Sequence, residues 1–176
     1  MFKKKSAYVL PVVILLFLSL ITSASTVGTS ASAEGRGDTV QHTTVYIHSL
    51  HSNKGVLSAI TDEIEWYQGA EADKIFAQRE PEAAAELGGT PDGYYIVNDS
   101  PTLTTYRIAP DATVTMQIYD RTGKLEDIDI HWNEKISLEE FTQQFAKNHN
   151  LDLSQFPYHL TIKDGVITSI VQQYIP

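Results

Sequence analysis

Apolar and polar residues alternate along several short segments of this chain, which is the pattern of β-strands with one buried face. In residues 43–50 ("TTVYIHSL") Val45 and Ile47 share one face, and the turn sequence "HSNKG" separates this segment from residues 56–67. We expect these two segments to form a hairpin. Turn sequences also bound four further predicted strands, at residues 94–98, 102–108, 113–119 and 124–132.

Two regions show helical spacing instead. The first covers residues 69–80 and resumes at 82–87 after Pro81, and Gly88 and Gly89 are expected to end it. The second begins at Ser137, which together with Glu140 has the spacing of a capping box. Ile136 and Phe141 have the spacing of the hydrophobic staple that accompanies such a box.

The C-terminal segment "IKDGVITSIVQQYIP" predicts a final hairpin, because Asp164-Gly165 is a strong signal for a two-residue turn. On its outgoing strand the apolar positions Ile167 and Ile170 are three residues apart, which indicates a β-bulge near Thr168 and Ser169. The last strand is therefore expected to belong to the sheet. Taken together, the elements predict an α+β fold, with a curled antiparallel β-sheet or small β-barrel and two covering helices.

The N-terminal residues have the order of a secretory signal. Three lysines at positions 3–5 precede an apolar run, and Ala31-Ser32-Ala33 fits the cleavage rule for such signals. We predict a signal peptide at residues 1–33, a flexible leader at 34–41 and a single globular domain at 42–176. The protein is then secreted and extracellular, and an uncleaved N-terminal membrane anchor is the alternative.

Charge restricts the partners. The chain has no cysteine and carries 13 basic against 22 acidic residues, a formal net charge of −9. Removal of residues 1–33 takes away three lysines and no acid, which leaves −12. Such a charge repels nucleic acid and anionic membranes and favours basic partners. We expect a monomer that binds neither nucleic acid nor, after cleavage, a membrane.

Three segments resemble a loose group of small exported proteins of Gram-positive bacteria. These are "EWYQGAEA", the strand sequence "DGYYIVN" and the C-terminal "DGVITSIVQQY". The second segment matches the shared pattern D-G-[FY]-Y-I-x-N, and the third matches D-G-x-I-T-x-I-x-x-x-Y. The resemblance covers the chain from about Val45 onward. It implies export and one shared domain, and it implies no activity, cofactor or ligand.

Carboxylates provide the main candidates for catalysis. Asp62 and Glu65 lie beside Trp66, and a pair of carboxylates can hydrolyse a glycosidic bond. His48 and His51 are the closest approach to a metal pair, but on a strand residues three apart face opposite sides. No cofactor motif is present, so we predict no metal and no cofactor.

Aromatic residues provide the candidates for binding. In the pair Tyr94-Tyr95 alternation sends one ring inward and one outward, and an outward tyrosine beside Asn98 can stack on a sugar or a partner chain. With Trp66, these residues form the predicted binding site. The sequence thus favours a noncatalytic binding or interaction domain whose partner is an unknown protein or carbohydrate. A small hydrolase that uses Asp62 or Glu65, and an inhibitor of a secreted enzyme, are the alternatives.

Overall fold

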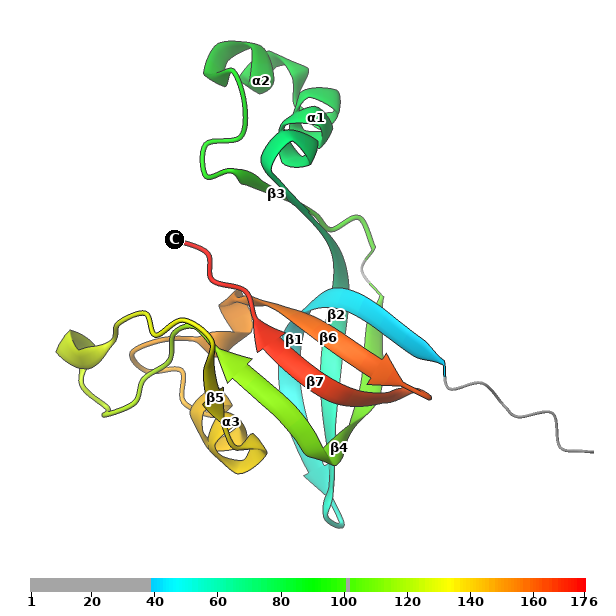
Figure 1. The fold of residues 1–176 in the computed structure, drawn as a ribbon, viewed down its shortest axis with the longest axis vertical. Coiled ribbons are helices and arrows are strands. Elements are labelled where there is room, and N and C mark those ends of the chain that lie inside the picture. Colours follow the sequence, from blue (N-terminus) through cyan, green and yellow to red (C-terminus); the bar gives the residue numbers. More distant parts are fainter. Residues whose placement is uncertain (1–38, 101) are drawn as a thin grey trace, which may run out of the picture. The chain divides into compact units, whose positions relative to one another are not determined.

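The computed structural model describes residues 39–100 and 102–176, so the predicted signal peptide and most of the leader lie outside the described residues. The elements follow in the order β1 (Val40–Asn53), β2 (Val56–Gln68), α1 (Gly69–Arg79), α2 (Pro81–Leu87), β3 (Tyr94–Val97), β4 (Leu103–Met116), β5 (Glu134–Ile136), α3 (Leu138–Phe145), β6 (Pro157–Lys163) and β7 (Val166–Gln172) (Figure 1). Two short 3-10 turns lie at Leu125–Asp127 and Leu153–Gln155.

Five of these strands close into a barrel. Around the ring, β2 pairs with β1, β1 with β6, β6 with β7, β7 with β4, and β4 again with β2, while β3 and β5 extend the sheet outside the ring. The prediction of an α+β small barrel is confirmed, although β4 and β7 run parallel and the sheet is therefore mixed. OB-folds are barrels of five strands as well, and a fold of this kind does not by itself assign a function.

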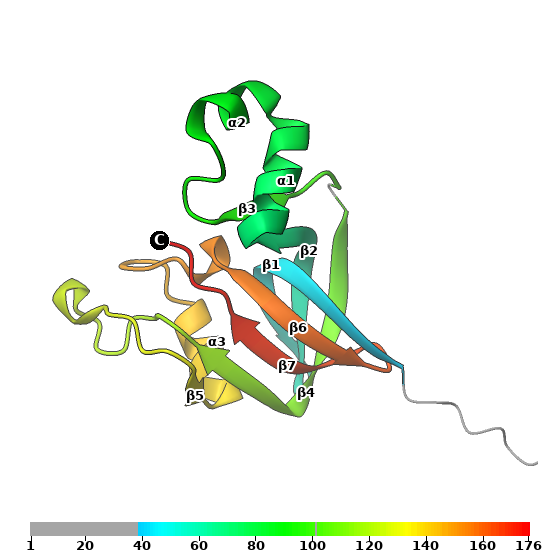
Figure 2. The ribbon, with the colours of Figure 1, turned by 45° about the horizontal axis from the view of Figure 1, so that its top comes forward.

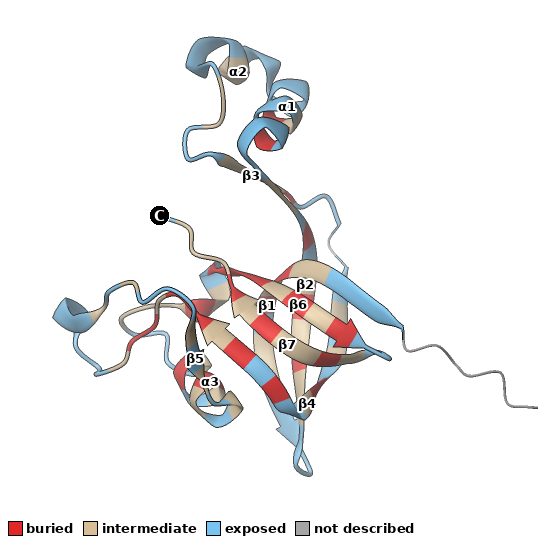
Figure 3. Cartoon of the chain, viewed as in Figure 1, coloured by how far each residue is buried: buried red, intermediate tan, exposed pale blue. Residues whose placement is uncertain are grey.

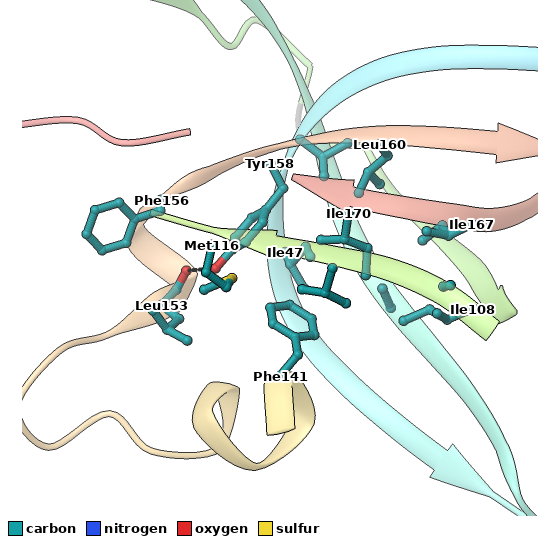
Figure 4. Close-up of a cluster of buried hydrophobic side chains, with 14 of the residues drawn as sticks. Ile47, Ile108, Met116, Phe141, Leu153, Phe156, Tyr158, Leu160, Ile167 and Ile170 are labelled. Carbon is teal, nitrogen blue, oxygen red and sulfur yellow. Dashed lines mark hydrogen bonds between the residues drawn. The ribbon is translucent and has the colours of Figure 1, made fainter. Parts of the chain in front are cut away.

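The barrel interior is a continuous apolar core. It is formed by alternate residues of the barrel strands, and Phe141 of α3 enters it from one end (Figure 4). The largest fully buried hydrophobic side chains are Val45, Ile47, Val114, Met116, Phe141, Leu153, Tyr158, Leu160, Ile162, Ile167 and Ile170. The predicted face of β1, with Val45 and Ile47, therefore faces the core.

Helix α3 begins as its sequence predicts. The Ser137 hydroxyl accepts a hydrogen bond from the Glu140 backbone N–H at 3.0 Å, and Phe141 is fully buried. The spacing of a capping box also predicts a hydrogen bond from the Ser137 backbone N–H to the Glu140 carboxylate. The carboxylate instead accepts a hydrogen bond from the Tyr119 hydroxyl at 3.4 Å. Since α3 closes the barrel end, its cap positions the helix that completes the core.

The other two helices do not cover the barrel. α1 buries Ala72 and Phe76 against β2 and β3, and α2 has no fully buried residue (Figure 3). Gly88 ends α2 in the left-handed conformation, with φ of 76°. The prediction of two helices over the sheet is confirmed, since α3 packs on the barrel core and α1 packs on the part of β2 that extends beyond the barrel to pair with β3.

Two strand predictions are wrong. The turn expected between residues 108 and 113 is absent, because β4 is one strand whose pairing with β7 is interrupted between Ile108 and Thr113. Pro110 lies in this interruption, where its missing N–H costs no ladder bond. Residues 124–132 form a 3-10 turn and irregular chain instead of a strand.

The irregular segment finds its hydrogen bonds elsewhere. The Asp129 carbonyl accepts from the Arg121 guanidinium at 3.1 Å, and the His131 N–H donates to the Gln117 carbonyl at 2.8 Å. Trp132, at the end of this segment, is 65% exposed and contacts Tyr174 edge-on. The alternation of apolar and polar residues in this segment therefore does not correspond to the two faces of a β-sheet.

The C-terminal hairpin is confirmed. Asp164 and Gly165 form its turn with φ of 50° and 78°, and the pairing of β6 with β7 leaves Thr168 as the extra residue of a bulge. β7 lies between β6 and β4, so the last strand completes the barrel. β1 begins at Val40, which pairs with Lys163 and lies two residues before the predicted domain boundary at 42.

A partly buried ion pair makes stability depend on pH. Arg121 donates to the Glu134 carboxylate through Nε at 3.0 Å and Nη2 at 2.5 Å, and this holds the pKa of Glu134 below its ordinary value of 4.5. A lowered carboxyl pKa stabilises the fold above the unfolded pKa, and this contribution is lost as the pH falls through the lower folded pKa. Glu134→Gln should reduce stability to urea at pH 7 and have a smaller effect at pH 3. An equal loss at both pH values would contradict this.

Candidate functional site

The candidate site lies on the outside of the barrel, where β2 continues toward β3. Because Val45 and Ile47 point into the core, Tyr46 between them points outward, and it pairs with Asp62 of β2. Trp66 pairs with Ile96 of β3, which places Tyr94 and Asn98 on the same side of that strand. We call this group the outer-face cluster, and its members are Tyr46, Asp62, Trp66, Tyr94, Asn98 and His159.

An aromatic stack forms one half of the outer-face cluster. The rings of Trp66 and Tyr94 are nearly parallel, at 16°, with centroids 4.7 Å apart. His159 of β6 meets Trp66 edge-on at 6.4 Å, and its ring is fixed by Thr44 Oγ1 at 2.9 Å and by Gln173 Oε1 at 3.1 Å. Side chains from β2, β3 and β6 thus hold the indole in one orientation.

A polar pair forms the other half. The Asn98 amide donates to Asp62 Oδ2 at 2.7 Å, which leaves Asp62 Oδ1 without a partner among the described residues although this atom is buried. The Trp66 indole N–H is also buried and has no acceptor in the described part of the chain. A buried polar group without a partner costs about 1–3 kcal/mol, so water or a ligand is expected to satisfy these two.

Two tyrosine hydroxyl groups of the cluster are affected by burial. The pKa of the Tyr46 hydroxyl is raised, first by burial and then by the neighbouring Tyr94 and Asp62. Tyr94 itself has a raised pKa, also mainly because of burial. Polar contacts made here are therefore stronger than they are in water.

The remaining predicted residues lie on the opposite face of the β2–β3 ribbon, below α1. Tyr95 contacts Phe76, with ring centroids 5.4 Å apart, and donates to Glu80 at 2.5 Å, a bond that raises the pKa of its hydroxyl. Glu65 accepts a hydrogen bond from the Tyr67 hydroxyl at 2.5 Å. Tyr94 and Tyr95 thus lie on opposite faces of the ribbon, and both rings are partly buried.

The structure does not bring the two candidate catalytic carboxylates together. Asp62 and Glu65 are three residues apart on β2 and project from opposite faces, where each binds a different neighbour. The retaining and inverting glycosidases require two carboxyl groups about 5–9.5 Å apart across one substrate bond. This geometry therefore offers no carboxylate pair from these two residues.

The histidines of the first hairpin do not meet either. His48 is the residue skipped in the pairing of β1 with β2, and the His51 ring contacts Ser49 Oγ at 3.0 Å. Within residues 39–100 and 102–176, no three His, Asp or Glu side chains lie close enough to hold a metal ion.

Four members of the cluster were candidates from the sequence, namely Trp66, Tyr94 and Asn98 for binding and Asp62 for the alternative of catalysis, but two members were missed. Tyr46 and His159 reach it only because β1 pairs with both β2 and β6, through Tyr46↔Asp62 and Thr44↔His159. The outward parity of Tyr46 was available in the sequence. The contribution of β6 was not, because it depends on the order of strands around the barrel.

Comparisons with protein-family models, curated proteins and solved structures found no match. None of the helices in the described residues has the length and apolar character needed to cross a membrane.

Proposed function

We propose that this chain is an exported, noncatalytic binding domain of the cell exterior, and that the outer-face cluster binds a carbohydrate. The observation that carries the proposal is the pair of unpartnered buried atoms, the Trp66 indole N–H and Asp62 Oδ1, beside a stacked aromatic pair. One atom is a donor and the other an acceptor. A sugar carries several hydroxyl groups, each of which can accept from the indole N–H or donate to the carboxylate oxygen.

The elements around the cluster allow a ligand to reach these atoms. Tyr94 and Asn98 belong to the four-residue strand β3 and the chain just after it, and β3 pairs with β2 alone. Asn98 is exposed. A ligand hydroxyl can take the place of the Asn98 amide at Asp62, and a sugar ring can pack on Tyr94. Both contacts require movement of this short edge segment only.

Export is the other part of the proposal, and it rests on the predicted signal at residues 1–33, which lies outside the described residues. The resemblance to small exported proteins and the acidic balance support it. The intact mass of protein recovered from culture medium tests it. A secreted species that still carries Met1, or protein held only in the membrane, would contradict cleavage after Ala33.

The binding test uses substitutions that remove one polar atom each. Trp66→Phe deletes the indole N–H, and Asp62→Asn replaces the carboxylate. We expect Asp62→Asn to bind at least tenfold more weakly to the polysaccharide that the parent retains, since hydrogen bonds to a charged group are worth about 1.5–3 kcal/mol. Trp66→Phe should bind about two- to tenfold more weakly, since a hydrogen bond between neutral groups is worth about 0.5–1.5 kcal/mol. Retention on insoluble peptidoglycan, chitin and cellulose, followed by calorimetry with soluble fragments, gives the measurement.

Tyr67→Phe is the matched control, because it also removes one polar atom from an aromatic ring, but on the opposite face of β2. It should bind like the parent. Thermal melts show whether Trp66→Phe remains folded, and we expect a melt close to that of the parent because the lost donor has no protein partner. If no polysaccharide is retained, or if Trp66→Phe binds as well as the parent, the carbohydrate proposal fails. Loss of turnover with unaltered binding in Asp62→Asn would indicate the hydrolase instead.

A further inference from the structure

A second concave surface lies at the end of the barrel that α3 closes. It is a groove of about 870 Å³ lined by the turn of the β1–β2 hairpin, the interrupted part of β4 and the first turns of α3. Figures 1 and 2 show where these elements lie in the fold. This volume falls in the range of about 300–1,000 Å³ that small-molecule sites occupy. None of the residues of the outer-face cluster lines it, so the two surfaces are independent.

The walls of the groove are mainly apolar. The apolar side chains that line it include Val56, Leu57, Ile108, Pro110, Leu138 and Val166. Val56 is 46% exposed although it is a large hydrophobic residue near a hairpin turn. Apolar surface left open in a concave site favours a ligand with an apolar body.

One cation at the groove lacks a partner. Within the described residues the chain has three arginines, and Arg79 binds Asp99 while Arg121 binds Glu134. The side chain of Arg107, which lines the groove, forms no hydrogen bond or ion pair with any described residue. The guanidinium is the side chain best suited to bind a carboxylate through two parallel hydrogen bonds. In so acidic a protein, an arginine without an acid is a local site for an anion.

The acid that shares the groove does not neutralise this cation. Glu139 of α3 lines the groove, but its carboxylate accepts a weak contact from Gln143 at 3.4 Å and is not within ion-pair distance of Arg107. It lies on the helix wall, while Arg107 lies on β4. A ligand whose negative charge is confined to one end can therefore meet Arg107 and keep away from Glu139.

We propose that this groove binds a fatty acid, with the carboxylate on Arg107 and the acyl chain along the apolar walls. A peptide is less suited, because each of its amides needs a hydrogen-bonding partner when buried, and the apolar side chains that form most of the wall provide none. An acyl chain buries apolar surface without that cost. The charge at one end and the apolar body match the two features that the groove combines.

The test uses dodecanoate with a photoreactive diazirine in its chain, crosslinked to the full chain and mapped by mass spectrometry. We expect crosslinks within residues 52–57, 107–110 and 138–143 and at Val166, which together line the groove. Arg107→Gln should lower the crosslink yield at these peptides at least tenfold at a fixed, submicellar concentration of probe. Lys74→Gln, a charge removed from α1, is the matched control and should leave the yield unchanged.

The head group is tested separately. Dodecanol has the same chain without the charge. In the parent it should displace the photoreactive probe at least tenfold less well than dodecanoate does. In Arg107→Gln the two competitors should displace the probe about equally well. Circular dichroism verifies that the variants are folded. The proposal is overturned if crosslinks fall away from the residues that line the groove, if Arg107→Gln labels like the parent, or if dodecanol and dodecanoate compete equally. None of these outcomes depends on sugar binding at the outer-face cluster.

Discussion

Removing residues 171–176 should leave the protein largely unfolded. The deletion takes the last two residues of β7, the strand that joins β6 to β4 and closes the barrel. It also removes fully buried Gln172 and the partly buried Tyr174 and Ile175, which pack against the core. Losing a single large buried side chain costs about 2–5 kcal/mol, and the whole stability of a domain is only about 5–15 kcal/mol.

Far-ultraviolet circular dichroism and thermal melting of the deleted and complete chains give the measurement. Deletion of Pro176 alone is the matched control, since this residue is exposed and lies after the strand. The chain without Pro176 should have the same melting temperature as the complete chain. If the chain without residues 171–176 melts within a few degrees of the complete one, the barrel does not depend on closure by β7.

Elements whose signals are local could be predicted from the sequence. The N-cap at Ser137, the turn at Asp164-Gly165 and the bulge at Thr168 each depend on residues within a few positions of one another. The alternation of Val45 and Ile47 gave the correct buried face because β1 is paired on both sides along part of its length. These predictions required no knowledge of which strands are neighbours.

Predictions that depended on distant partners failed. Residues 124–132 alternate as a strand does, but no neighbouring strand is available to them, and a side chain of Arg121 takes the place of the ladder at Asp129. The parallel pairing of β4 with β7 brings together segments about 60 residues apart, which no local pattern reports. A strand is defined by its neighbours as much as by its own residues.

The candidate site shows the same division. Trp66, Tyr94 and Asn98 were recognisable as aromatic and polar residues near strand ends, but their contacts were not. That Asn98 binds Asp62 follows from the pairing of β2 with β3. The groove at Arg107 had no sequence signal, because its walls come from a hairpin turn, an interrupted strand and a helix start.

Gln172→Leu should cost about 2–6 kcal/mol, because it leaves two buried donors without an acceptor at about 1–3 kcal/mol each. The Gln172 side-chain oxygen accepts hydrogen bonds from the backbone N–H groups of Gln117 and Ile118 at 2.8 and 2.9 Å. In addition, the side-chain amide of Gln117 donates to the backbone carbonyl of Gln172 at 3.1 Å. These bonds join the chain after β4 to the end of β7, beyond the last paired residues of the ladder. Part of the cost is offset because the Gln172 amide nitrogen is itself buried without a partner in the described residues.

Urea denaturation of the variant and of Gln155→Leu gives the comparison. Gln155 is exposed, and its amide makes only long contacts, at 3.3 and 3.5 Å, so the same substitution there should change stability by less than about 0.5 kcal/mol. Amide hydrogen exchange locates the effect, since the N–H groups of Gln117 and Ile118 should lose protection first when their acceptor is removed. A loss below about 1 kcal/mol, or unchanged protection at these two amides, would show that the core of this barrel closes without the glutamine.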